Sequence, residues 1–134
     1  MLVSRLPIRI YYEDTDAGGI VYYANYLKFF ERGRTELLRE SYIEQDVLLE
    51  KNIAFVVKNV ELNYVKPARF NELITVKTEV IACHKASLQF KQEIFHKNGE
   101  LLCTAMTLIA CINLQKMKPM AIPSEITEVI SSAR

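Results

Sequence analysis

The sequence contains little that would support metal, disulfide or redox chemistry. Its three cysteines, Cys83, Cys103 and Cys111, form no Cys-x-x-Cys pair. An odd number of cysteines at this spacing argues against a disulfide framework and against a zinc site. We expect reduced cysteines in a cytoplasmic protein, with Cys103 and Cys111 on the same side of one strand as small core residues.

An excess of charge of one sign and long apolar runs are also missing. With 17 basic and 16 acidic residues the net charge is +1, so no strong overall field attracts nucleic acid or a membrane surface. The longest largely apolar run, residues 101–114, is shorter than the roughly 18 residues of a membrane-spanning helix. Residues 1–7 lack the apolar core of a secretory signal. We therefore expect no nucleic-acid partner, no membrane span and no leader segment.

Phosphate-binding loops and histidine sites are scarce as well. The sequence has neither a P-loop nor a Gly-x-Gly-x-x-Gly motif. The two histidines, His84 and His96, lie beside lysines near predicted strand ends, without the spacing of metal ligands. We interpret both as surface residues.

What is present indicates one globular domain over residues 1–134, because half of the residues are hydrophobic and a quarter are charged. Helical spacing of apolar residues predicts a long helix from about residue 26 to 40 and a shorter one over 43–51. Alternation predicts strands at 8–13, 53–64, 73–83, 87–96 and 101–114. This order favours an α+β fold, in which an antiparallel sheet buries one hydrophobic helix.

Three details of this pattern predict packing. Gly33 in the long helix is explained by close approach of that helix to the sheet. The strand at 101–114 is apolar on both faces, which suggests burial of its second face against another subunit. The strand at 53–64 is expected to direct four side chains toward a buried face: Val56, Val60, Leu62 and Tyr64.

Two carboxylates, Asp14 and Asp16, precede two glycines and the long helix. The plain interpretation is a turn in which aspartates bond nearby backbone N–H groups. The spacing does not fit a calcium loop, which needs Asp or Asn at its fifth position and Glu at its twelfth, where this sequence has Gly18 and Asn25. A carboxylate beside the unpaired N–H groups of a helix N-terminus could also act on a carbonyl carbon. The pattern alone leaves the turn and the catalytic interpretation open.

Residues 12–26 read Tyr-x-Asp-Thr-Asp-x-x-Gly-x-Val-Tyr-x-x-Asn-Tyr. This run resembles the signature of hotdog-fold thioesterases of the 4-hydroxybenzoyl-CoA thioesterase family, in particular the bacterial YbgC-type acyl-CoA thioesterases associated with the Tol-Pal system. Residues 31–36, 54–57 and 116–119 are also similar to that subfamily. The resemblance implies a five-stranded antiparallel sheet wrapped around one long central helix, and hydrolysis of an acyl-CoA to a free acid and coenzyme A.

The resemblance also implies roles for the residues of the motif. Asp16 takes the place of the catalytic carboxylate, which attacks the thioester carbonyl or activates a water. The backbone N–H of Tyr23 points at the thioester oxygen. Gly18 and Gly19 are turn glycines with positive φ that leave room for the substrate, and Gly18 and Val21 are expected to contact it. Asp14 is interpreted as a turn or cap residue.

Further binding residues and partners are implied in the same way. Two basic clusters are candidate contacts to the coenzyme A phosphates: His84, Lys85 and Ser87 in one, Lys116 and Lys118 in the other. Glu31 on the long helix is the fallback catalytic carboxylate. No metal or redox cofactor is expected, since coenzyme A is part of the substrate. A homodimer or homotetramer with active sites at the subunit interface is expected, and acyl carrier protein is a possible partner.

The sequence departs from the subfamily at one position, and two alternative functions remain open. Tyr23 stands where many YbgC-type sequences carry histidine, which changes the side chain but not the backbone role. A non-catalytic binder of acyl-CoA or acyl carrier protein would keep the pocket without depending on Asp16. A hotdog 3-hydroxyacyl thioester dehydratase would need a histidine near the helix start, and no histidine precedes His84.

Overall fold

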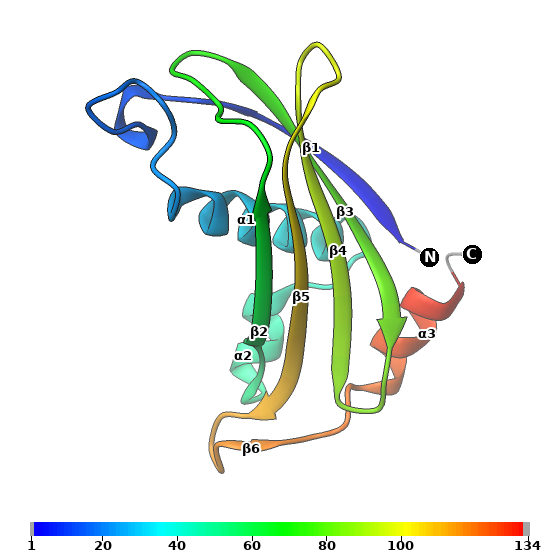
Figure 1. Cartoon of the computed structure of the whole chain (residues 1–134). Coiled ribbons are helices and arrows are strands. Elements are labelled where there is room, and N and C mark those ends of the chain that lie inside the picture. Colours follow the sequence, from blue (N-terminus) through cyan, green and yellow to red (C-terminus); the bar gives the residue numbers. More distant parts are fainter. Residues whose placement is uncertain (1, 133–134) are drawn as a thin grey trace.

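The computed structural model describes residues 2–132, in which an antiparallel sheet curls around one long helix (Figure 1). The elements in chain order are β1 (Val3–Arg9), the 3₁₀ turn η1 (Tyr12–Asp14), α1 (Asn25–Glu40), α2 (Gln45–Glu50), β2 (Ile53–Tyr64), β3 (Leu73–Cys83), β4 (Ser87–His96), β5 (Leu101–Asn113), β6 (Lys118–Pro119) and α3 (Ser124–Ser132). The strand order is β1-β3-β4-β5-β2, and the two-residue β6 pairs with β5. The expected α+β hotdog fold is confirmed.

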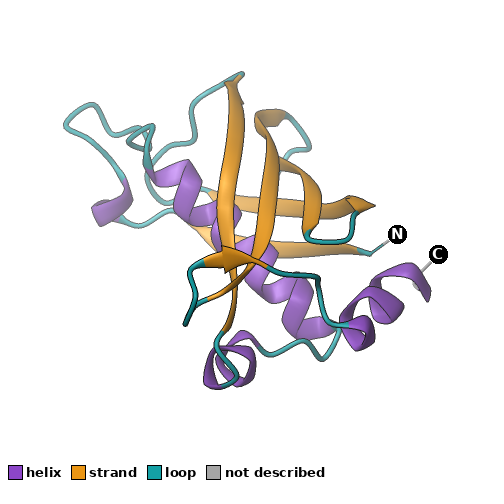
Figure 2. Cartoon of the chain, turned by 90° about the horizontal axis from the view of Figure 1, so that it is seen from below, coloured by secondary structure: helices purple, strands orange, loops and turns teal. Residues whose placement is uncertain are grey.

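The core lies between α1 and the concave face of the sheet. Figure 2 shows α1 running along that face, with the strands curved around it. The helix buries one stripe at helical spacing: Tyr26, Phe29, Phe30, Gly33, Arg34, Leu37 and Leu38. Alternate residues of β3 and β4 meet this stripe: Ile74, Val76, Val80, Leu88, Phe90 and Ile94. Each large apolar side chain buried in this way contributes about 1.5–3 kcal/mol, so this contact holds α1 in place.

The close approach predicted at Gly33 is confirmed. A Cβ atom there would lie 2.6 Å from Oγ1 of Thr78 and 2.8 Å from Cγ1 of Val76. Beside this contact the buried amide of Gln92 donates to the carbonyl of Phe30 (2.8 Å) and to Oγ1 of Thr78 (2.9 Å). Helix and sheet are therefore joined here by a polar contact and by direct backbone packing.

The first strand differs from the prediction, because it begins at Val3 and ends at Arg9 instead of spanning 8–13. Residues 12–14 form the 3₁₀ turn η1, in which the Asp14 carboxylate accepts a hydrogen bond from the N–H of Tyr11 (2.8 Å). This local bond competes with a strand ladder. Pro7 is tolerated within β1 because β1 is an edge strand of the sheet.

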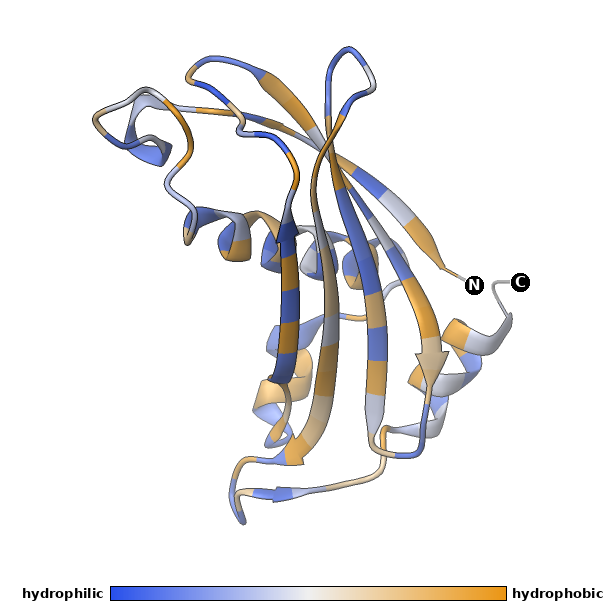
Figure 3. Cartoon of the chain, viewed as in Figure 1, coloured by the Kyte–Doolittle hydropathy of each residue, from blue (hydrophilic) through white to orange (hydrophobic). Residues whose placement is uncertain are grey.

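The strand β2 is the other edge, and the expected burial of its side chains is wrong within one chain. Val56, Val60 and Tyr64 are 38%, 36% and 50% exposed, and Leu62 is half-buried. The reason is a register shift between Val57 and Asn59, which pairs Val56 with Ala110 and Val60 with Thr107 and so turns the two valines to opposite faces of this edge strand. On β5 the inward residues Cys103 and Cys111 are buried as predicted, and Figure 3 shows how hydrophobic this strand is along its length.

None of the helices within residues 2–132 combines the length and the apolar character that a membrane crossing requires.

Candidate active site

Residues 14–22, here called the Asp16 loop, form a tight loop that leads into α1. The N–H of Asp16 donates to the carbonyl of Ile20 (2.9 Å), and the N–H of Gly19 donates to the carbonyl of Asp16 (3.1 Å). Gly19 has φ +78°, a conformation that glycine adopts without steric cost. The loop therefore holds the backbone at Asp16 in a tight turn that precedes the helix.

The Asp16 side chain is exposed, and its Oδ1 accepts a hydrogen bond from the N–H of Gly18 (2.8 Å). No other hydrogen bond to this carboxylate occurs among residues 2–132. The expectation of positive φ at Gly18 is wrong, because only Gly19 adopts it within the loop. Gly18 is instead a close neighbour of the carboxylate, since a Cβ atom there would lie 3.3 Å from Oδ1 of Asp16.

Asp14 is a structural residue, as the turn interpretation predicted. Its carboxylate is bound to the N–H of Tyr11, and its carbonyl accepts from the N–H of Tyr22 (3.0 Å) and from Nδ2 of Asn25 (2.9 Å). Asp14 thereby ties the beginning of the Asp16 loop to the first residue of α1. The two aspartates therefore differ in their surroundings, and Asp16 is the more exposed of the two.

The N-terminus of α1 follows the Asp16 loop and has unpaired donors. The helix begins at Asn25 after Ala24, and no side chain caps it. Tyr23 is 63% exposed, and its backbone N–H makes no hydrogen bond within residues 2–132. Unpaired N–H groups and the helix dipole favour negative charge at such a position. The geometry therefore offers donors for an oxygen that becomes negatively charged.

Aromatic side chains fix the helix start against the end of β2. The hydroxyl of Tyr64 donates to the carbonyl of Tyr23 (3.0 Å), and the rings of Tyr26 and Tyr64 lie 5.5 Å apart. Tyr26 is buried, which raises the pKa of its hydroxyl, and its oxygen accepts from the N–H of Ala68 (3.1 Å). The helix start is thus attached both to β2 and to the segment that follows it.

Residues 68–72, here called the supporting segment, lie behind the Asp16 loop. The N–H of Val21 donates to the carbonyl of Ala68 (2.9 Å), and the N–H of Phe70 donates to the carbonyl of Gly19 (3.1 Å). The side chain of Val21, a predicted substrate contact, is only 4% exposed and lies in the core. The shape of the Asp16 loop therefore depends on the supporting segment.

A cavity of about 590 Å³ lies between α1 and the strands β2 and β5. Its apolar lining includes Leu27, Val57 and Val60, and Glu31 and Arg34 add charged groups. Arg34 is only 9% exposed and donates to Oε1 of Gln92 (3.0 Å). Burial lowers the pKa of its guanidinium, and the nearby charge of Glu31 opposes this shift. An apolar group with a polar substituent would fit such a lining.

The two predicted basic clusters are not brought to Asp16 within one chain. His84 and Lys85 lie in the turn between β3 and β4, and Ser87 closes that turn by accepting the N–H of His84 at its carbonyl (2.8 Å). Lys116 precedes β6 and Lys118 begins it. Figure 1 shows both turns at the end of the sheet opposite to the Asp16 loop.

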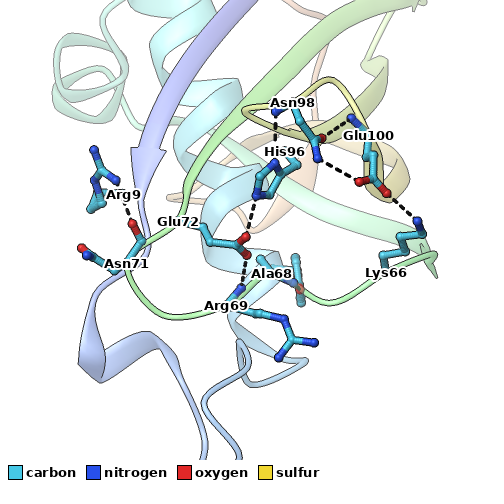
Figure 4. A network of polar contacts seen from close by, with 10 residues as sticks. Arg9, Lys66, Ala68, Arg69, Asn71, Glu72, His96, Asn98 and Glu100 are labelled. Atoms are coloured by element: carbon cyan, nitrogen blue, oxygen red, sulfur yellow. Dashed lines mark hydrogen bonds and ion pairs between the residues drawn. The ribbon is translucent and has the colours of Figure 1, made fainter.

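One polar network near the site was not predicted from the sequence. The interpretation of His96 as a surface residue is wrong: its side chain is only 24% exposed, and Nε2 lies 2.5 Å from Oε2 of Glu72 (Figure 4). Glu72 belongs to the supporting segment, whereas His96 ends β4. No sequence signal relates the two positions, because they are brought together only by the pairing of β3 with β4.

A long helix wrapped by an antiparallel sheet, with a carboxylate loop at the helix N-terminus, defines a class of proteins. The model of the thioesterase-like superfamily matches residues 11–130, and the chain belongs to this superfamily.

Individual relatives narrow the class. The chain is 46% identical over 121 residues to the acyl-CoA thioesterase YbgC of Haemophilus influenzae, covering 90% of this chain and 88% of the relative. It is 43% identical over 122 residues to the acyl-CoA thioester hydrolase YbgC of Escherichia coli O6:H1, covering 91% of each. The DHNA-CoA thioesterase structure from Staphylococcus aureus matches with a TM-score of 0.94 at 28% identity, covering 98% of this chain and 91% of that one. The resemblance found in residues 12–26 is confirmed.

Proposed function

We infer that this chain hydrolyses an acyl-CoA thioester to a free carboxylic acid and coenzyme A. The observation that carries this conclusion is identity of 43–46% along nine-tenths of the chain with proteins named as acyl-CoA thioesterases. The exposed Asp16 carboxylate and the unpaired N–H of Tyr23, both in the segment that leads into α1, supply the matching chemistry. Water is the second reactant, so we propose no metal or redox cofactor.

We propose that Asp16 supplies the attack. As a general base it takes a proton from water, whose oxygen bonds to the thioester carbon. As a nucleophile it bonds to that carbon itself, and water then opens the resulting anhydride. In both routes the carbon–sulfur bond breaks and the sulfur leaves with a proton as coenzyme A. The Tyr23 N–H stabilises the carbonyl oxygen while it is negatively charged, and Gly18 and Gly19 leave the approach open.

We propose that the acyl group enters the cavity between α1 and β2. The cavity begins at Leu27, near the helix N-terminus, and its apolar lining suits a hydrocarbon group. Glu31 lines this cavity, which makes it a better candidate for substrate contact than for attack. We propose that the substrate carries its acyl group on coenzyme A, with acyl carrier protein as the alternative carrier. We propose that the reaction takes place in the cytoplasm.

We propose a homodimer or homotetramer as the active form. Supporting this, the edge of β2 is unpaired within residues 2–132, and Val57 on this strand is 51% exposed. Natural proteins rarely leave a long apolar edge strand uncovered. Because the basic turns at residues 84–87 and 116–118 lie far from the Asp16 loop of their own chain, we propose that they reach coenzyme A phosphates at the site of a neighbouring subunit.

The test is thiol release from short, medium and long aliphatic acyl-CoAs and from 4-hydroxybenzoyl-CoA. We expect Asp16→Asn, which keeps the side-chain shape and the Gly18 contact, to lower kcat by about 100-fold or more, as is typical for loss of a general base. Glu13→Gln, at an exposed acid of the same turn, is the matched control and should retain activity.

Two results would contradict the proposal. Hydrolysis by Asp16→Asn at the wild-type rate would exclude Asp16 as the catalytic residue. A folded wild-type protein that binds acyl-CoA but releases no thiol would favour the non-catalytic binder. Repeating the assay with acyl carrier protein thioesters identifies the acyl donor.

A further inference from the structure

We propose that Glu72 and His96 are positioning residues, which together hold the supporting segment in the conformation that orients the Asp16 loop. The kinetic part of this proposal rests on the proposed thioesterase function. Its structural part concerns the same loop but does not require any activity. The argument follows the contacts outward from Asp16 to His96.

The Asp16 loop is attached to the supporting segment through residues 19–21, at the end of its tight turn. The carbonyl of Gly19 accepts from the N–H of Phe70, and the N–H of Val21 donates to the carbonyl of Ala68. Ile20 also pairs with Arg69 as an isolated β-bridge. A shift of residues 68–70 would therefore move the backbone on which the Asp16 carboxylate is mounted.

The supporting segment is attached to the end of β1 at Asn71, where its backbone turns. Asn71 has φ +70°, a value that is uncommon for residues other than glycine. Arg9 donates from Nη1 to the carbonyl of Asn71 (2.7 Å), and the N–H of Asn71 donates to the carbonyl of Ile10 (2.9 Å). These bonds attach the segment to β1, on the side away from the β4–β5 hairpin.

Glu72 attaches the segment on the other side, using both carboxylate oxygens. Its Oε1 accepts from the N–H of Arg69 (2.6 Å), which closes the turn formed by residues 69–72. Its Oε2 contacts Nε2 of His96 (2.5 Å). Both side chains are about three-quarters buried, with exposed fractions of 26% and 24%. Charged hydrogen bonds in a partly dehydrated place are stronger and more directional than exposed ones.

The orientation of the His96 ring is set by the hairpin between β4 and β5. The N–H of Asn98 donates to Nδ1 of His96 (3.0 Å), so Nδ1 must be the nitrogen without a proton. The neutral ring then carries its proton on Nε2 and donates it to Glu72. Figure 4 shows this chain of contacts from Asn98 through His96 and Glu72 to the N–H of Arg69. The hairpin thereby holds the turn at residues 69–72, and this turn supports the Asp16 loop.

A pair of substitutions at His96 separates this role from simple packing. His96→Gln places an amide N–H near the former Nε2 and keeps the bond to Glu72. His96→Asn keeps a polar group near the former Nδ1 but is too short to reach Glu72. We expect His96→Asn to lower kcat about 10-fold with KM within about 2-fold, because a small displacement of the attacking group costs rate rather than binding. His96→Gln should stay within about 2-fold of wild type.

Lys66→Ala is the matched control on the same network. Lys66 forms an exposed ion pair with Glu100 of the hairpin and makes no side-chain bond to the supporting segment. We expect it to leave both kcat and KM unchanged. If His96→Asn does not fold, Glu72→Gln takes its place in the test. The glutamine amide would direct its N–H groups at either Arg69 or His96, although both of these residues donate hydrogen bonds to position 72. The same loss of kcat is expected.

Hydrogen exchange provides a readout that is independent of activity. We expect the backbone amides of Val21 and Phe70 to exchange about 10-fold faster in His96→Asn, but not in His96→Gln or in Lys66→Ala. The proposal would be overturned if His96→Asn kept the amide exchange rates and the kcat of the wild type. It would also be overturned if His96→Asn and His96→Gln lost kcat equally. If the wild type releases no thiol from any substrate, the proposed function fails, while exchange at Val21 and Phe70 still decides whether the two residues hold the loop.

Discussion

At the scale of single residues, the functional difference between Asp14 and Asp16 comes from their hydrogen bonds. Asp14 is occupied by the N–H of Tyr11 and by the start of α1, whereas Asp16 is exposed and contacts only Gly18. Their spacing in the sequence does not reveal this difference. The resemblance of residues 12–26 to a thioesterase motif predicts Asp16 as the catalytic carboxylate, and the hydrogen bonds of Asp14 make that residue unsuited to the same role.

The two glycines of the loop give a prediction at this scale. Gly18→Ala requires no unusual φ but places Cβ 3.3 Å from Oδ1 of Asp16, so we expect kcat to fall about 10-fold while stability changes by about 0.5 kcal/mol or less. Gly19→Ala meets no atom within 4 Å but is strained at φ +78°, so we expect a loss of about 1–2 kcal/mol of stability. Thiol release and urea unfolding measure the two effects. Equal effects of the two substitutions on both quantities would contradict this division of roles.

At the scale of elements, α1 is held to the sheet by a close backbone approach and a buried polar layer. Gly33 leaves no space for a side chain, and Gln92 joins the helix carbonyl of Phe30 to Thr78 on β3. Arg34 contacts the same glutamine from the helix. This layer fixes the axial position of α1, and with it the position of the helix N-terminus at the site.

Gly33→Ala tests this contact. Helix propensity alone favours alanine by about 1 kcal/mol, but its Cβ would lie 2.6 Å from Oγ1 of Thr78, and overpacking of a core costs about 1–3 kcal/mol. Because the neighbouring atoms belong to side chains held in the core, we expect a net loss of about 1–2 kcal/mol in urea unfolding. Glu40→Ala, at an exposed position of the same helix, should change stability by about 0.5 kcal/mol or less. A Gly33→Ala variant more stable than wild type would show that the sheet can move away.

At the scale of the whole molecule, the exposed apolar edge of β2 is the feature that a single chain leaves unsatisfied. Val57 is 51% exposed on this edge, and the coenzyme-binding clusters proposed from the sequence lie at the far end of the sheet. Both observations are explained if a second copy covers the edge and completes the site.

Val56→Lys, at a residue of β2 that is 38% exposed and lies outside the cavity lining, should therefore weaken self-association. A lysine in the middle of an edge strand opposes pairing with another strand, so we expect at least a 10-fold increase in the dissociation constant, measured by light scattering over a dilution series. Ile81→Lys, at a residue of β3 that is 38% exposed and away from this edge, should leave the molecular mass unchanged. A wild type that is monomeric at micromolar concentration would contradict the proposed assembly.

The sequence by itself determined the elements whose signals are local. The long helix, the alternation of β3 and β4, the inward position of Cys103 and Cys111 and the turn role of Asp14 all follow from periodicity or from short-range hydrogen bonds. The close contact at Gly33 could also be inferred, since a glycine inside a helix needs a reason.

The tertiary structure alone decided what depends on strand order. The order β1-β3-β4-β5-β2 makes β2 an edge, and the register shift between Val57 and Asn59 turns Val56 and Val60 to opposite faces, although their spacing resembles that of a buried strand. The same pairing brings Glu72 to His96 across 24 positions of sequence and keeps the turn at residues 84–87 away from Asp16. Periodicity reports which face of a strand is apolar, but the neighbours of that face are set by contacts between residues distant in sequence.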